Sequence, residues 1–275
     1  MSTATVPRPV DLPRPRPLAD AMTMLGRQLR HARRYPELTV IVLLVPVVLL
    51  VLFVLVFGST LGAGLAPGAP ASRGAYADYV LPAILVMTIT SIAQGTSTTM
   101  AMDTTQGIID RFRTLSIAPG AVLSGHVLAA TIQSLLSMVV VTGVGLAVGF
   151  RPHASAVDWL LVVGLLTGLS FAVSWLSVAL GLASRTVESA SNYPMPLVLL
   201  PFLGSGFVPT DSMPAGLRSF AEYQPFTPVM DAVRGLLLGT PVQASTVWVG
   251  AGWCAVLAVA GWLLARRLYA RPRRG

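Results

Sequence analysis

The sequence predicts an all-α integral membrane protein with six transmembrane helices, and three observations support this fold class. Hydrophobic residues make up 54% of the 275 residues and charged residues only 11%, and the mean hydropathy of +0.72 is far above that of a soluble domain. Several apolar runs without charges reach the roughly 20 residues that a helix needs to cross the hydrocarbon core. Most of the arginines gather on one side of the topology that these runs define.

The apolar runs divide into six expected spans. The fifth contains Pro194, Pro196 and Pro201, which remove three backbone donors, so its freed carbonyl groups need partners in protein or beside a cavity. The expected spans are residues 39–57, 79–102, 121–150, 159–184, 189–210 and 245–265.

The arginines predict how the chain is oriented. All nineteen basic residues are arginines, and only four lie on the side opposite the termini: Arg73, Arg151, Arg218 and Arg234. Because Arg-rich flanks of spans stay in the cytoplasm, we expect both termini to be cytoplasmic. This topology, with attraction to anionic lipid, accounts for the net charge of +8. We expect no nucleic-acid partner, because the arginines flank spans and do not form one patch.

Three further segments flank the six-span domain, which we place at residues 37–266. Residues 1–17 hold five prolines and predict a disordered Pro/Arg-rich tail, and residues 267–275 predict a basic cytoplasmic tail. Residues 18–36 predict an amphipathic helix that lies in the membrane interface, or alternatively a soluble helix packed on a partner. Its apolar positions at helical spacing are Leu18, Met22, Leu25 and Leu29, and its basic positions are Arg27, Arg30 and Arg34.

A loop at residues 103–115 predicts a short cytoplasmic helix. Ile108, Phe112 and Leu115 follow one another at i, i+4 and i+7, and charged or polar side chains cover the rest. A helix with an aromatic ridge and flanking charges suits a groove on another protein. The alternative is an ordinary loop that folds back on the lipid headgroups.

The segment at residues 204–238 predicts two short helices between the last two spans. Neither is long enough to cross a bilayer. Asp231 and Arg234 can pair at i, i+3 on the second helix, and Gly239 lies just past its end. This segment is either a re-entrant pair of helices or a hairpin on the external surface.

The chain resembles the type-2 ABC exporter permeases, above all the daunorubicin-resistance-like group. The resemblance covers about residues 20–270 and is most specific in QGIIDRFRTLSIAPG at 106–120 and FVPTDSMPAGLRSFAEYQPFTPVMDAVRGLLLG at 207–239. It implies the membrane-spanning permease subunit of an ATP-driven exporter. The cargo would be a hydrophobic or amphipathic compound, drug-like, antibiotic-like or a lipid, moved outward across a bacterial cytoplasmic (inner) membrane.

The resemblance also implies partners and a coupling element. A separate ABC ATPase subunit would hold ATP and Mg²⁺, and a second permease copy would complete a homodimer or a heterodimer. The short helices at residues 211–239 would be extracellular and re-entrant, and the loop at 103–120 would be the coupling helix that receives the motion of the ATPase. Its expected contact residues are Ile108, Asp110, Arg111, Phe112, Arg113 and Leu115.

No motif in the chain predicts chemistry of its own. A P-loop GxxxxGK[ST] and an HExxH zinc motif are both absent from the sequence, so we expect no catalytic, cofactor-binding or metal-binding residues. An ion-coupled secondary transporter is the main alternative, but such proteins place ionisable side chains in mid-membrane, and His126 is the only candidate here. A type-2 permease for a lipid-linked glycan is the other alternative.

Polar and aromatic side chains predict the translocation path. Exposure of a polar side chain to lipid costs free energy. The polar side chains of the second and third spans should therefore point into the protein, where they would contact other helices or the substrate. The resemblance adds the fifth span, which borders the central path in the family. The expected path residues are Ser91, Gln94, Thr98, Gln133, Ser137, Tyr193, Met195, Phe202 and Phe207.

Overall fold

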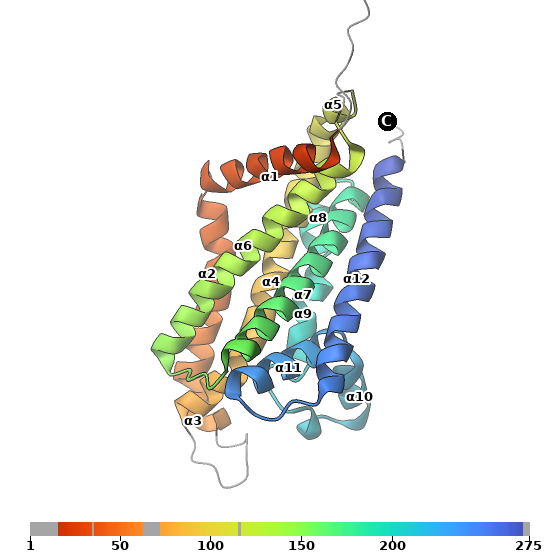
Figure 1. Cartoon of the computed structure of the whole chain (residues 1–275). Helices are drawn as coiled ribbons and strands as arrows, with labels where there is room; N and C mark the ends of the chain where they lie inside the picture. The colour runs from red at the N-terminus through yellow and green to blue at the C-terminus, as the bar shows by residue number, and fades with distance from the viewer. Residues whose placement is uncertain (1–15, 35, 63–71, 115–116, 272–275) are drawn as a thin grey trace, which may run out of the picture.

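The protein folds into a bundle of long helices with short helices at both ends (Figure 1). The structure is a computed structural model and describes residues 16–34, 36–62, 72–114 and 117–271, in which every regular element is helical. The predicted all-α membrane fold is confirmed. In chain order the elements are α1 Pro17–Arg34, α2 Pro36–Leu52, the π-helical turn η1 Phe53–Phe57, α3 Gly58–Leu61, α4 Arg73–Thr105, α5 Ile108–Thr114, α6 Pro119–Val148, α7 Ala156–Ala183, α8 Val187–Asn192, α9 Met195–Leu199, the 3-10 turns η3 Leu200–Leu203 and η4 Thr210–Ser212, α10 Ala215–Tyr223, α11 Phe226–Leu238 and α12 Ala244–Ala270.

Among the residues that the structure describes, five helical stretches are long and apolar enough to cross a membrane. Four are uninterrupted α-helices, and the first combines most of α2 with η1 and part of α3. They match five of the six expected spans, although α12 continues to Ala270, into the segment expected to be a tail. The five stretches are Val42–Thr60, Arg73–Thr105, Gly120–Val148, Ala156–Ala183 and Ala244–Ala270.

The expected fifth span, residues 189–210, is not one continuous helix. Three short pieces replace it, α8, α9 and η3, and a turn follows them at residues 204–207. Figure 1 shows α8 near the end of the bundle that carries α1, and α9 further toward the end that carries α10 and α11. The segment expected as the fifth span is therefore a broken helix, because prolines at 194, 196 and 201 cannot donate to the helical ladder.

Side chains from outside the broken helix bind the carbonyl groups left free along it. In a regular helix Ala190 O would accept from residue 194, but Pro194 has no N–H, and Ser97 Oγ donates to Ala190 O instead, at 2.9 Å. Gln94 Nε2 donates to the next carbonyl, Ser191 O, at 2.7 Å. Polar groups of α4 thus hold the broken helix in place, as expected for irregular backbone at membrane depth.

Helix α4 is the centre of the bundle. Almost all of its residues from Tyr76 to Ala93 are buried, and it packs against α2, α6, α7, α8 and α11. Two glycines bring neighbouring helices close together, because a Cβ at Gly181 of α7 would lie 2.5 Å from Ser97 O of α4, and a Cβ at Gly261 of α12 would lie 2.6 Å from Leu176 N of α7. Small residues therefore set the α4–α7–α12 packing.

Helix α1 crosses the end of the bundle instead of running along it (Figure 1). The helix forms as predicted, and its apolar residues divide between two sides. Ala21, Met24 and Leu25 are buried, and α1 packs on α6, whereas Leu18 is 84% and Met22 63% exposed. The helix is therefore apolar on two sides, one facing the bundle and one free to meet lipid.

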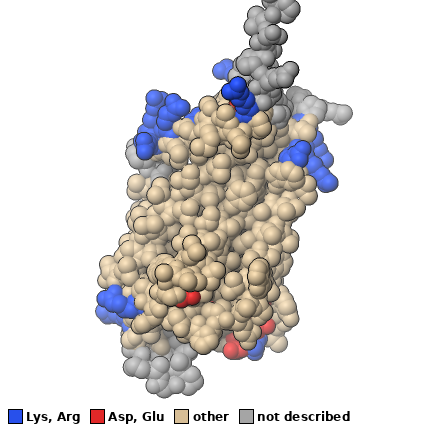
Figure 2. Space-filling model, viewed as in Figure 1, with Lys and Arg blue, Asp and Glu red and all other residues tan. Residues whose placement is uncertain are grey.

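Charged residues lie at the two ends of the molecule. Figure 2 shows arginines clustered at the end that carries α1 and the last turns of α12, a middle band without charges on this face, and a few charges of both signs at the other end. We call the first of these the arginine-rich end. Its charges on described residues include Arg27, Arg30, Arg185 and Arg266. The uncharged band is the surface expected of a protein embedded in hydrocarbon.

Candidate functional site

The loop after α4 forms a short helix at the arginine-rich end. Helix α4 ends at Thr105, and Gly107 has a φ of +69°, a left-handed conformation that only glycine adopts readily. The chain then enters α5, whose Arg111 N–H donates to Gly107 O at 3.1 Å. The turn at Gly107 thus folds the expected coupling helix back beside the end of α4.

Helix α5 is anchored by a residue that the sequence pattern did not single out. Ile109 is only 2% exposed and lies in a hydrophobic cluster with Met100, Leu123 and Trp175, which come from α4, α6 and α7. The predicted ridge was Ile108, Phe112 and Leu115. The tandem Ile108–Ile109 was the available signal, because two successive apolar residues on a helix point to different faces.

The predicted contact residues of α5 lie on its other sides. Asp110 and Arg111 are exposed, and Ile108 and Phe112 are half-buried. Phe112 lies beneath the guanidinium of Arg27 from α1, 5.4 Å from the ring centroid, which is cation–π distance. Leu115 and the side chain of Arg113 fall outside the described part of the chain.

A cluster of polar side chains joins α1 to α4 and α6 next to α5. Arg27 binds Asp103 through two hydrogen bonds of 2.8 Å each, a bidentate pair in which the Asp103 side chain is only 13% exposed. His126 is 3% exposed, and its Nε2 lies 2.8 Å from Gln28 Nε2 and 3.4 Å from Asp103 Oδ2. Its Nδ1 donates to Val122 O at 3.0 Å. We call Arg27, Gln28, Asp103 and His126 the α1 cluster.

The sequence did not predict the α1 cluster. Asp103 was only the first residue of the loop predicted at residues 103–115, and His126 was the lone candidate for ion coupling. These residues are 76 to 98 positions away from their α1 partners, beyond any helical spacing. The structure gives His126 partners on two other helices, which fits a structural role.

The polar residues expected on the path have several roles. Gln94 binds the backbone of α8, and Thr98 donates to Gln94 O at 3.1 Å, which is a bond within α4. Ser137 is buried in the bundle, whereas Ser91 and Gln133 are half-buried. Gln94 thus forms a bond between helices, and this bond serves the broken helix.

The broken helix presents an apolar face to the outside of the single chain. Tyr193 and Met195 are each 48% exposed, and Phe202 is also exposed. Phe207 is instead buried and stacks on Phe202, with centroids 4.7 Å apart, and it also lies 4.9 Å from the ring of Phe53. Three of the four expected residues from this span are thus accessible, and the fourth, Phe207, is buried against Phe202.

A second polar network fixes the far end of the broken helix. Arg234 pairs with Asp231 at 2.6 Å, as the i, i+3 spacing predicted, and also donates to Ser205 O at 2.7 Å and Tyr79 O at 3.1 Å. Its guanidinium lies 4.0 Å from the centroid of the Tyr79 ring. Two further hydrogen bonds complete the network. Ser205 Oγ donates to Asp231 Oδ1, and Tyr79 Oη donates to Ser205 O. Helices α4 and α11 and the turn at 204–207 are therefore joined at this end.

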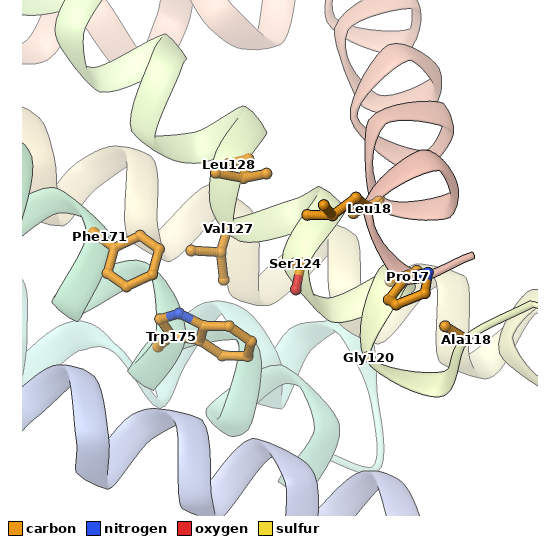
Figure 3. Close-up of a pocket in the computed structure, with 11 residues that line it drawn as sticks. Pro17, Leu18, Ala118, Gly120, Ser124, Val127, Leu128, Phe171 and Trp175 are labelled. Atoms are coloured by element: carbon orange, nitrogen blue, oxygen red, sulfur yellow. The ribbon is translucent and has the colours of Figure 1, made fainter. Parts of the chain in front are cut away.

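An apolar groove of about 360 Å³ opens between α1, α6 and α7 near the arginine-rich end (Figure 3). Figure 3 shows Phe171 and Trp175 from α7 on one side of it and Leu18 of α1 on another. Val127 and Trp175 belong both to this groove and to the cluster that buries Ile109. The groove thus adjoins the anchor of α5.

Helical stretches long and apolar enough to cross a membrane, with α1 across one end of the bundle and the short α5 on the loop after α4, identify a multi-pass membrane protein. The chain belongs to the ABC-2 type transporter family, whose model matches residues 20–238. The predicted resemblance is confirmed, and the protein is the multi-pass permease subunit of an ABC exporter, which works with an ABC ATPase.

Curated relatives support the same family. The chain is 27% identical, over 221 residues, to the daunorubicin resistance ABC transporter permease protein DrrB1 of Streptomyces coeruleorubidus, and the match covers 80% of this chain and 75% of that protein. It is 28% identical, over 159 residues, to the probable doxorubicin resistance ABC transporter permease protein DrrC of Mycobacterium tuberculosis, with 56% of each chain covered. The identity and the coverage are the same for the DrrC proteins of the two strains CDC 1551 / Oshkosh and ATCC 25618 / H37Rv.

Proposed function

We propose that this permease exports hydrophobic or amphipathic compounds of the drug or antibiotic type, driven by ATP and Mg²⁺ bound on its partner ATPase. The observation that carries the proposal is the similarity to permeases named for daunorubicin and doxorubicin resistance. The exposed Tyr193, Met195 and Phe202 support it, since aromatic and thioether groups suit planar apolar cargo. This face offers little hydrogen bonding for a glycan, and the family membership does not favour ion coupling.

The translocation path would run along the broken helix, with a second permease copy facing it as a homodimer or a heterodimer. Tyr193, Met195 and Phe202 would line the path, and Phe207 would support Phe202 from beneath. Ser91, Gln94, Thr98, Gln133 and Ser137 would form the scaffold behind them, with substrate contact for those that turn toward the second copy. A single chain leaves this face open, so the path is incomplete without the partner copy.

The coupling helix would be α5. Ile109 ties it to α4, α6 and α7, while Asp110 and Arg111 stay exposed for an ATPase groove. Phe112 would enter that groove, with Ile108 and Leu115 beside it and Arg113 at the rim. Buried aromatic residues with polar surroundings dominate interfaces of this kind.

The arginine-rich end would face the cytoplasm of a bacterium, with both termini inside and α10 and α11 outside or dipping into the outer leaflet. Cysteine labelling on a Cys254→Ser background tests this orientation. A cysteine replacing Gly216 on α10 should react with an impermeant reagent in intact cells, and one replacing the exposed Gln106 should react only after permeabilisation. Labelling of position 106 in intact cells would contradict the orientation.

The cargo can be tested in a doxorubicin-sensitive bacterial host. Cells that express the permease together with its partner ATPase should accumulate less doxorubicin than cells that express either subunit alone. If the pair leaves doxorubicin and daunorubicin accumulation unchanged but moves a fluorescent phospholipid between leaflets, the cargo is a lipid and the drug proposal is wrong.

A further inference from the structure

We propose that the groove between α1, α6 and α7 binds one anionic phospholipid, with part of an acyl chain inside the groove and the headgroup at its mouth, beside Arg16. The groove encloses about 360 Å³, and its lining side chains are apolar except for Ser124 and the indole nitrogen of Trp175. A volume of this size lies within the range of small-molecule sites. Such binding depends neither on the identity of the cargo nor on the coupling role of α5.

Two hydrogen-bond donors of the groove are unpaired within the described part of the chain. Trp175 is only 6% exposed and touches Phe171 edge to face, with ring centroids 6.2 Å apart, but no described group accepts from its indole N–H. A buried indole N–H usually has an acceptor. The Ser124 hydroxyl is also unpaired among these residues, and Figure 3 shows it directed between α6 and α7. A phospholipid supplies ester carbonyl oxygens that can accept from both groups.

The groove opens toward the outside of the bundle, where a lipid chain can enter it sideways. Leu18 at one edge is 84% exposed, and Phe171 at another is 39% exposed. The groove also lies near the arginine-rich end, where the uncharged band of the surface gives way to charge (Figure 2). Tryptophan is enriched at this depth of a membrane, level with the headgroup region. A chain in the groove would therefore place its ester groups close to Trp175.

Positive charge at the mouth of the groove favours an anionic headgroup. Arg16 directly precedes Pro17, which lines the groove, and its exposed guanidinium has no partner among the described residues. The carboxylate of Asp20 lies at the same corner, but its Oδ2 already accepts from the backbone N–H groups of Ala118 at 3.0 Å and Arg16 at 3.1 Å. Basic sites between helices at a membrane surface bind anionic headgroups in this way.

Tryptophan fluorescence tests the proposal in the full-length permease, purified in detergent. Replacement of the other four tryptophans by phenylalanine leaves Trp175 as the emitter: Trp159, Trp248, Trp253 and Trp262. Phosphatidylglycerol brominated near the ester end of one chain should quench Trp175 saturably. It should reach half-saturation at about one fifth of the concentration that equally brominated phosphatidylcholine needs, the effect expected of one arginine beside an anionic lipid. Arg16→Gln should remove this difference, whereas Arg33→Gln, at the other end of α1, should keep it.

Filling the groove should displace the lipid. A Cβ at Gly120, which lines the groove, would meet no atom within 4 Å, so Gly120→Leu adds a side chain without a clash. It should raise the half-saturating concentration about tenfold, as expected when about two methylene groups leave the groove. Gly143→Leu is the matched control, because Gly143 is exposed on the same helix, has equal space around it and lies outside the groove. Equal Tm values for the two variants would show that both keep the fold.

Native mass spectrometry gives a second measurement on the unmodified chain, which should retain one more phosphatidylglycerol than Gly120→Leu does. Equal half-saturation by the two lipids would overturn the anionic assignment. Quenching that never saturates, or that Gly120→Leu leaves unchanged, would overturn the site itself. Saturable quenching by doxorubicin that phosphatidylglycerol does not relieve would assign the groove to the cargo and contradict the lipid proposal.

Discussion

Replacement of Phe112 by alanine should abolish export and weaken the binding of the ATPase to the permease. A buried aromatic residue at the centre of an interface typically contributes about 2 kcal/mol or more, which corresponds to roughly 30-fold in Kd. Phe112 is half-buried in the single chain, so part of its ring remains available to a partner. Titration of purified ATPase onto the permease in nanodiscs measures the change.

A control variant separates the roles of neighbouring residues. Arg111→Ala should weaken binding less, because exposed charges at the rim of an interface act mainly on the rate of encounter. If Phe112→Ala binds the ATPase and exports as wild type at equal expression, α5 is not the coupling element.

Replacement of Arg234 by methionine should strongly destabilise the end of the broken helix. The change removes the ion pair with Asp231, two hydrogen bonds to backbone carbonyl groups and the contact with the Tyr79 ring. Loss of hydrogen bonds to a charged group should lower the free energy of unfolding by about 2 kcal/mol or more. Thermal unfolding in detergent should show a clear decrease in Tm.

The matched control for Arg234 is Arg218 of α10. Arg218 also pairs with carboxylates, Asp211 and Glu222, but all three side chains are well exposed to solvent. Because exposed ion pairs contribute little, Arg218→Met should leave the Tm almost unchanged. Equal decreases in Tm for the two variants would show that the Arg234 network is not a special support of this end.

The fold could be predicted largely from hydropathy and from arginine positions, because the bilayer demands long apolar helices. The expected passage at residues 189–210 was the exception. Its apolar character predicted a span, and its prolines predicted free carbonyl groups, but the donors that satisfy them, Ser97 and Gln94, lie more than 90 residues away. A sequence pattern shows that partners are needed and does not identify them.

The candidate site was predictable in its local parts only. The pair Asp231–Arg234 followed from helical spacing, whereas the α1 cluster depends on how three separate helices meet. The second apolar side of α1 could not be predicted from helical spacing for a related reason. The predicted stripe includes Leu18 and Met22, which are exposed, and the bundle buries the neighbouring face with Ala21 and Met24, because close contact at Gly125 favours small and flexible side chains there.

The central claim is that this chain is a permease driven by a separate ATPase through α5, and reconstitution tests it most directly. Doxorubicin uptake into inside-out proteoliposomes should occur only when the permease, its ATPase and MgATP are all present, and vanadate should stop it. The permease alone should hydrolyse no ATP. Transport by the permease alone under an imposed proton gradient would contradict the account.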